Sequence, residues 1–177
     1  MGEEYGLEIL EFEDALATVG LRPEDVNLII HTHLHNDHCE NDYKCPQAKI
    51  VVQQKELDFF HNPHPIDHRY YSDLLDGLEV ETVDGDVTLR DGIDLLLTPG
   101  HTPGGQSIAI NTSVGRVVVT GFCCNDMNFP ADGPVVTPGV HTDAIAAYES
   151  AKRISEIADV IIPLHSLTVG RQKRIPT

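Results

Sequence analysis

The stretch HTHLHNDHCE, residues 31–40, sets four histidines and an aspartate within eight positions. It follows the apolar run VNLII (residues 26–30), and together they predict a buried strand that ends in histidines. Residues two apart on an extended strand face the same side, so His33 and His35 direct two imidazoles to one point. Asp37 and His38 follow after a turn and supply a carboxylate and a further imidazole nearby. Imidazole and carboxylate are common ligands of zinc, and they also suit iron and manganese.

Two more histidines stand at the ends of predicted strands. The run IDLLLT (93–98) leads into the glycine- and proline-rich PGHTPGG, where the backbone bends sharply around His101. The run VIIPLH (160–165) ends at His165, and RVVVTG (116–121) ends at Phe-Cys-Cys. Neighbouring strands end on a common rim of a sheet, and loops at such rims often carry functional residues. We therefore expect these side chains to converge on the histidine-rich stretch and to complete a metal site.

The other histidines have a plainer interpretation. Most single histidines are surface residues or hydrogen-bonded core residues, and we expect this of His61, His64, His68 and His141. The loop that carries the first three is alternatively a wall of a substrate pocket. His31 shares a strand face with the two strand-end histidines but lies deeper, which favours a buried hydrogen bond over direct ligation.

Composition indicates one soluble domain over residues 1–177, with 41% apolar residues to build a core. The net charge of -16 excludes nucleic acids and anionic membrane surfaces as partners. The sequence lacks an apolar run of the roughly 18 residues that a membrane span needs, and its first residues lack a signal-peptide pattern. We therefore expect a cytoplasmic protein whose 4 cysteines are thiols.

The remaining patterns predict a mixture of helices and strands. Helices are expected over 7–20, 54–62 and 142–158, the last with Thr142 or Asp143 as its N-cap. Hairpins are expected between 78–83 and 86–90, around Asp84-Gly85, and between 106–111 and 116–121. Together with strands over 48–53 and 93–98, these elements predict an α+β protein.

The motif HLHNDH (33–38), followed by PGHTPGGQS (99–107) and a histidine after the last strand, resembles the metallo-β-lactamase superfamily. The second motif looks most like the lactonase-like branch, which includes N-acyl homoserine lactonases. The resemblance covers about residues 7–170 and implies a four-layer αββα sandwich. It also implies two ligand groups, which are His33, His35 and His101 for one metal and Asp37, His38 and His165 for a second.

The resemblance implies a metal-dependent hydrolase that acts on a small molecule. One or two zinc ions, with iron or manganese as alternatives, would supply a metal-bound hydroxide that attacks a lactone, ester or thioester carbonyl. Asp37 would orient the water and move a proton to the leaving group. Two alternatives stay open, which are a glyoxalase II-like thioesterase and a metal-binding protein without catalysis.

The sequence departs from the family pattern at two places. Phe122 stands where the family has an aspartate that bridges the two metals, and a phenyl ring cannot do so. Cys123 is next, and its thiolate would be a good ligand, although adjacent cysteines at a strand end are also common small core residues. Whether the site holds one metal or two therefore depends on this segment.

The second departure is at the start of the chain. Family members usually open with several strands before the helix that leads to the histidine motif, whereas this sequence starts at that helix. We therefore expect an N-terminally truncated form of the sandwich. A sheet that lacks strands exposes an edge and apolar surface, so we expect a homo-oligomer, most simply a dimer.

Overall fold

A computed structural model describes residues 10–170 of the protein. The small sheet has the strand order β1-β2-β3, and the large sheet has the order β4-β5-β6-β7-β8. The strands are β1 (Leu28–Ile30), β2 (Lys49–Gln53), β3 (Glu79–Val83), β4 (Val87–Arg90), β5 (Ile93–Leu97), β6 (Gln106–Thr112), β7 (Gly115–Val119) and β8 (Val160–Ile162). The helices are α1 (Phe12–Ala17), α2 (Asn36–Cys39), α3 (Gln54–His61), α4 (Ala144–Ile157) and α5 (Leu167–Gly170), with short 3-10 turns at Pro23–Asp25, Asp42–Lys44 and Asp126–Asn128.

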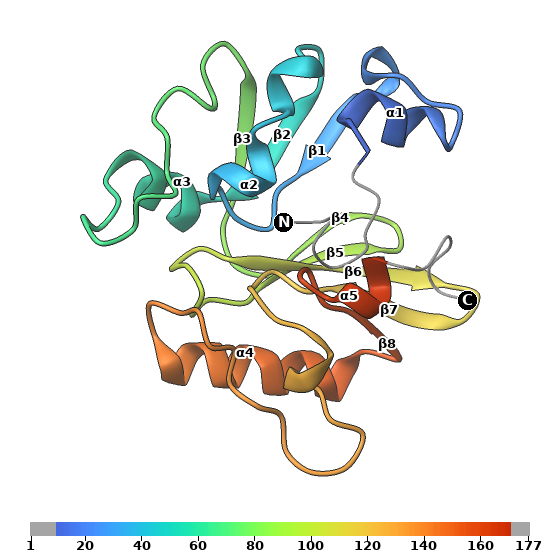
Figure 1. Cartoon of the computed structure of the whole chain (residues 1–177), viewed down its shortest axis with the longest axis vertical. Helices are drawn as coiled ribbons and strands as arrows, with labels where there is room; N and C mark the ends of the chain where they lie inside the picture. The colour runs from blue at the N-terminus through green and yellow to red at the C-terminus, as the bar shows by residue number, and fades with distance from the viewer. Residues whose placement is uncertain (1–9, 171–177) are drawn as a thin grey trace.

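The elements form four layers, with the two sheets face to face and helices on both outer sides (Figure 1). Alternation along the strands creates this arrangement, because successive side chains point to opposite faces. Val51 of β2 lies in the core between the sheets, whereas Val52 packs under α3. Leu95 of β5 faces the same inner core, whereas Leu96 packs under α4. The predicted α+β sandwich is confirmed.

Most predicted strands and helices are present at nearly the predicted bounds. The helix expected over 7–20 is shorter, because α1 spans Phe12–Ala17, and residues 7–9 lie outside the described part of the chain. β6 and β7 pair antiparallel and form the second predicted hairpin. Over residues 10–170, none of the helices is long and apolar enough to cross a membrane.

The hairpin predicted around Asp84-Gly85 is wrong. β3 pairs in parallel with β2, while β4 pairs antiparallel with β5, so the two strands belong to different sheets. Gly85 has φ +74, as the predicted tight turn requires. The side chain of Gln53 fixes this turn, since its amide donates to the carbonyl of Gly85 at 2.8 Å and accepts from the Gly85 N–H at 2.9 Å. The turn thus carries the chain from one sheet to the other.

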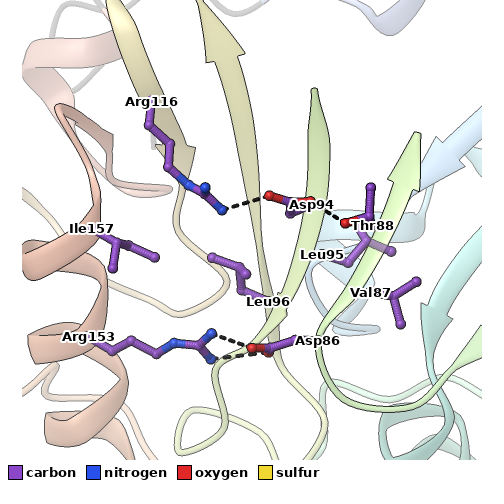
Figure 2. Close-up of a pocket in the computed structure, with 9 residues that line it drawn as sticks. All are labelled: Asp86, Val87, Thr88, Asp94, Leu95, Leu96, Arg116, Arg153 and Ile157. Carbon is purple, nitrogen blue, oxygen red and sulfur yellow. Dashed lines mark hydrogen bonds and ion pairs between the residues drawn. The ribbon is translucent and has the colours of Figure 1, made fainter. Parts of the chain in front are cut away.

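α4 covers the outer face of the large sheet. The side chain of Asp143 accepts hydrogen bonds from two backbone N–H groups of its first turn, so Asp143 is the N-cap. Farther along, Arg153 forms an ion pair with Asp86, and Arg116 pairs with Asp94 at 2.7 Å (Figure 2). These residues border a hollow of about 420 Å³ between α4 and the β4–β5 edge. Each arginine is paired with an aspartate. Arg153 joins α4 to the segment before β4, and Arg116 joins β7 to β5 across the large sheet.

The strands that lead to the predicted site run in the same direction. β5 and β7 are both antiparallel to β6, and β8 is parallel to β7, so these three strands end on one rim of the large sheet. The segment after β1 reaches the same place, because the backbone N–H of Gln106 donates to the carbonyl of Thr32 at 2.8 Å. The histidines that follow these strands are therefore brought to one region of the molecule.

Candidate metal centre

Three buried histidines converge from two strand ends. His33 and His35 follow β1, and His101 follows β5. These three residues are 0%, 1% and 2% exposed. One nitrogen from each ring lies within 4.8 Å of the others. The ring centroid of His33 is 4.7 Å from both other centroids, so the three imidazoles surround a common point.

Hydrogen bonds fix two of these rings. The Nδ1 of His101 lies 2.8 Å from the backbone carbonyl of Val140, to which it donates, which leaves Nε2 with a free lone pair. The Nε2 of His35 lies 3.1 Å from a carboxylate oxygen of Asp67, which leaves Nδ1 of that ring free. A hydrogen bond at one ring nitrogen sets the tautomer and orientation of a metal-ligating histidine. Both rings are therefore held with one nitrogen ready to bind a cation.

The hydrogen bonding of His33 indicates whether the residues present fit a metal ion. Its Nδ1 lies 3.1 Å from the hydroxyl of Thr32, whereas its buried Nε2 has no hydrogen-bond partner among the described residues. A buried polar atom without a partner costs free energy, so such atoms are rare, and a bound ion would supply the missing partner here. The residues present therefore fit a metal ion at this point.

A second ligand group adjoins the first. Asp37 and His38, on α2, and His165, after β8, each place one ligand atom within 4.8 Å of the others. This group is more open, because Asp37 and His165 are exposed and His38 is partly buried. The ring centroids of His33 and His38 are 4.1 Å apart, which joins the two groups into one centre. The structure thus brings together the six residues of the predicted ligand groups.

Burial keeps four of these imidazoles neutral, those of His33, His35, His38 and His101. Burial lowers the pKa of His33 well below its usual range, and burial also lowers the pKa of His35. Burial brings the pKa of His38 and that of His101 to about 4. Because only a neutral imidazole has a lone pair to give, the rings are in the metal-binding form at neutral pH.

An ion pair that the sequence did not reveal supports His35. The guanidinium of Arg69 donates to both carboxylate oxygens of Asp67, at 2.8 Å each, and one of these oxygens also contacts the His35 ring. Burial raises the pKa of Asp67, but the hydrogen bonds and charges of Arg69 and His35 outweigh it and bring the pKa to about 2. The carboxylate is therefore ionised and holds the ring of His35.

The segment after β7 contains Phe122, the departure in residue type, and the adjacent Cys123. Phe122 is fully buried and packs with Leu96 and Ile154 in the core under α4. Cys123 is partly buried and belongs to neither of the two ligand groups. Burial raises the pKa of Cys123, which the charge of Arg69 lowers and that of Asp37 raises. The role of Cys123 as a ligand stays a prediction.

The remaining predicted histidines fall into two classes. His31 is buried and its Nε2 is hydrogen-bonded to Asp42, which confirms the expected structural role. His64, His68 and His141 border a cavity of about 760 Å³ together with Phe59, Ile66 and Arg69. Asp67 also borders this cavity, and the same side chain contacts the ring of His35.

The comparisons with known proteins agree with this geometry. The sequence model of the metallo-beta-lactamase superfamily matches residues 1–162. The chain belongs to the metallo-β-lactamase superfamily. It is 30% identical over 150 residues to an N-acyl homoserine lactonase of Bacillus cereus, which covers 82% of this chain and 58% of that relative. It is 32% identical over 161 residues to the Metallo-beta-lactamase domain-containing protein 1 of Mus musculus, covering 86% of this chain and 53% of that relative.

The fold of the chain is also similar to that of a solved lactone hydrolase structure. An N-acyl homoserine lactone hydrolase with the product N-hexanoyl-L-homoserine at its catalytic metal centre superposes with a TM-score of 0.72 and 28% identity. The match covers 89% of this chain and 63% of that one. The chain thus spans between half and two thirds of the length of these superfamily members.

Proposed function

We propose that this member of the superfamily is a metal-dependent hydrolase that opens a lactone. The convergence of three buried, neutral imidazoles supports this proposal, together with the Nε2 of His33, which has no hydrogen-bond partner within residues 10–170. The similarity to N-acyl homoserine lactonases supports the choice of lactones over other carbonyl compounds. The net charge of -16 speaks against nucleic acid as substrate.

The proposed ligand assignment follows the two groups. His33, His35 and His101 would hold one ion, and Asp37, His38 and His165 would hold a second, with Cys123 as an added ligand. We propose zinc, with iron or manganese as alternatives. When bound, such an ion acts as a Lewis acid toward a carbonyl oxygen and makes water more acidic.

The chain's own residues bind the substrate and move a proton. Phe59 and Ile66 offer an apolar wall in the cavity that Asp67 borders, suited to the substituent of a lactone. Asp37 is exposed, with its side chain 54% accessible, and lies 3.5 Å from the ring of His38. We propose that this carboxylate takes a proton from water and gives it to the alkoxide that leaves when the ring opens.

Lactone opening releases an acid, which allows a direct test. We would follow proton release with a pH indicator for N-hexanoyl homoserine lactone, an unsubstituted lactone, an aryl ester and a thioester. The zinc-loaded protein should open the lactones, lose this activity in a chelator and regain it with zinc. His101→Ala should lower kcat/KM by at least about 100-fold, since even changes around metal ligands typically cost 10–100-fold.

A matched variant controls for the loss of a histidine. His61→Ala changes an exposed histidine at the end of α3 and should leave turnover unchanged. A preference for the thioester would favour the glyoxalase II-like alternative. A zinc-loaded protein that hydrolyses none of the four compounds would contradict the proposal and leave the non-catalytic metal-binding alternative.

We also propose a cellular location and an oligomeric state for the protein. We propose a cytoplasmic protein, in keeping with Cys39, Cys45, Cys123 and Cys124, all of which are free thiols. We propose a single domain and a homodimer, and sedimentation at micromolar concentration tests the latter. A stable monomer would contradict the dimer without affecting the proposed chemistry.

A further inference from the structure

Glu56 is a carboxylate in an unusual place. It lies in the first turn of α3 and is 0% exposed. Glutamate is almost never fully buried unless it is paired, because removal of its charge from water is costly. The partners of Glu56 therefore indicate why the fold retains it.

Each carboxylate oxygen of Glu56 serves a different loop. One oxygen accepts from the backbone N–H of Leu34 at 3.0 Å and from the hydroxyl of Tyr70 at 2.8 Å. The other accepts from the hydroxyl of Thr102 at 2.6 Å and from the backbone N–H of Gly104 at 3.3 Å. Each oxygen thus faces one backbone N–H, which can only donate.

These partners flank the buried histidines. Leu34 stands between His33 and His35, and Thr102 directly follows His101. The two loops come from different sheets and are far apart in the sequence. A single side chain therefore hydrogen-bonds to both segments that supply the first ligand group.

The backbone also requires close contact at this point. A Cβ atom placed on Gly104 would lie 2.1 Å from the backbone nitrogen of Glu56 and 2.5 Å from its Cα. Only glycine allows the loop after His101 to rest on α3 at this distance. The loop after His101 thus packs directly against the backbone of α3, and the position of this loop depends on that of Glu56.

We propose that Glu56 is a positioning residue that sets the separation between the His33/His35 loop and the His101 loop. This inference rests on the proposed function, because the separation matters through the metal that the three histidines hold. Glu56 itself touches neither the metal nor the substrate in this proposal. It acts by holding the two loops at a fixed separation, so that the ligand nitrogens of His33, His35 and His101 meet at one point.

The test compares Glu56→Gln with the wild type. The amide of the variant side chain has one acceptor oxygen, and its NH₂ group would face the donor N–H of one of the two loops. We expect the affinity for Co²⁺, used as a spectroscopic probe, to fall by about 10–100-fold. The visible spectrum of bound Co²⁺ should also change, because the geometry of the three nitrogens changes.

Three further variants control for unrelated effects. Asp58→Asn makes the same chemical change at an exposed position of the same helix and should keep the wild-type affinity. Ile154→Val removes one methyl group from the buried core under α4, far from both loops in the sequence. This variant shows how much a general loss of stability changes Co²⁺ binding. Tyr70→Phe removes one of the two donors on the Leu34 side and should have a smaller effect than Glu56→Gln.

A metal-free measurement separates this inference from the proposed function. In chelator, amide hydrogen exchange at Leu34 and at Gly104 should accelerate together in Glu56→Gln. An unchanged Co²⁺ affinity and spectrum, or faster exchange at only one loop, would overturn the inference. A wild-type protein that binds no metal would overturn the proposed function, and the exchange result alone would then decide whether Glu56 couples the two loops.

Discussion

Acid should destabilise the metal-free protein through its buried histidines. The pKa of His38 and that of His101 are lowered by burial from 6.5 to about 4. Between these values the unfolded chain binds more protons than the folded protein, so the free energy of unfolding falls as the pH falls. Stability should therefore be full above about pH 6.5 and should decline steadily below it.

The expected size of the loss follows from the same values. For one histidine with these two pKa values, a change from pH 7.5 to pH 5.5 lowers the free energy of unfolding by about 1.3 kcal/mol. His38 and His101 together give about 2–3 kcal/mol, a large fraction of the roughly 5–15 kcal/mol that stabilises a typical domain. His33 and His35, whose pKa values burial also lowers, add to this loss. Carboxylates with lowered pKa values, such as Asp67 at about 2, titrate below this window and do not contribute.

Urea denaturation in a chelator at pH 7.5, 6.5 and 5.5 measures this loss. His101→Gln should remove the share of one histidine, about 1.3 kcal/mol, because the variant has lost one titrating group. Zinc should raise the denaturation midpoint most at the highest pH, since protons compete with the metal for the imidazoles. A free energy of unfolding that stays constant to within about 1 kcal/mol over this range would refute the reasoning.

Three further predictions concern the surroundings of the site. Asp67→Asn should weaken zinc binding by about 10–100-fold in a chelator competition titration, because the amide holds the adjacent imidazole less firmly. Gly104→Ala should lower the free energy of unfolding by at least about 1–3 kcal/mol in urea melts, while Gly139→Ala, where a Cβ meets nothing within 4 Å, should be close to neutral. Cys123→Ala should reduce the metal content by elemental analysis from two ions per chain to one, and an unchanged content would remove this thiol from the ligand set.

The sequence was most informative where local pattern and chemistry coincide. Apolar runs that end in histidines predicted both the strands and the rim on which the ligands meet. The Asp84-Gly85 turn was predicted correctly as a turn, yet the hairpin was wrong. Turn chemistry specifies that the chain reverses, but the sheet that the next strand joins depends on distant partners. Here Gln53, more than thirty residues upstream, holds the turn between the sheets.

The residues that support the ligands had no distinctive sequence signal. Glu56 stands in an amphipathic helix where an exposed glutamate would look the same, and Asp67 stands in a loop that was expected only to shape a pocket. Their importance comes from contacts across the chain, with Gly104 in one case and His35 in the other. Such contacts become visible only when the loops are placed in space.

The burial of the three ligand histidines explains why the metal centre depends on Glu56 and Asp67. Three imidazoles are buried and kept neutral, and the Nε2 of His33 has no partner among the described residues, so the metal-free centre lowers the stability of the fold. Buried carboxylates offset this cost from outside the centre, Glu56 by joining two loops and Asp67 by holding one ring. A metal would offset it from inside by occupying the free nitrogens. The ligand histidines therefore keep their arrangement without a metal, because the hydrogen-bonded carboxylates of Glu56 and Asp67 hold them in place.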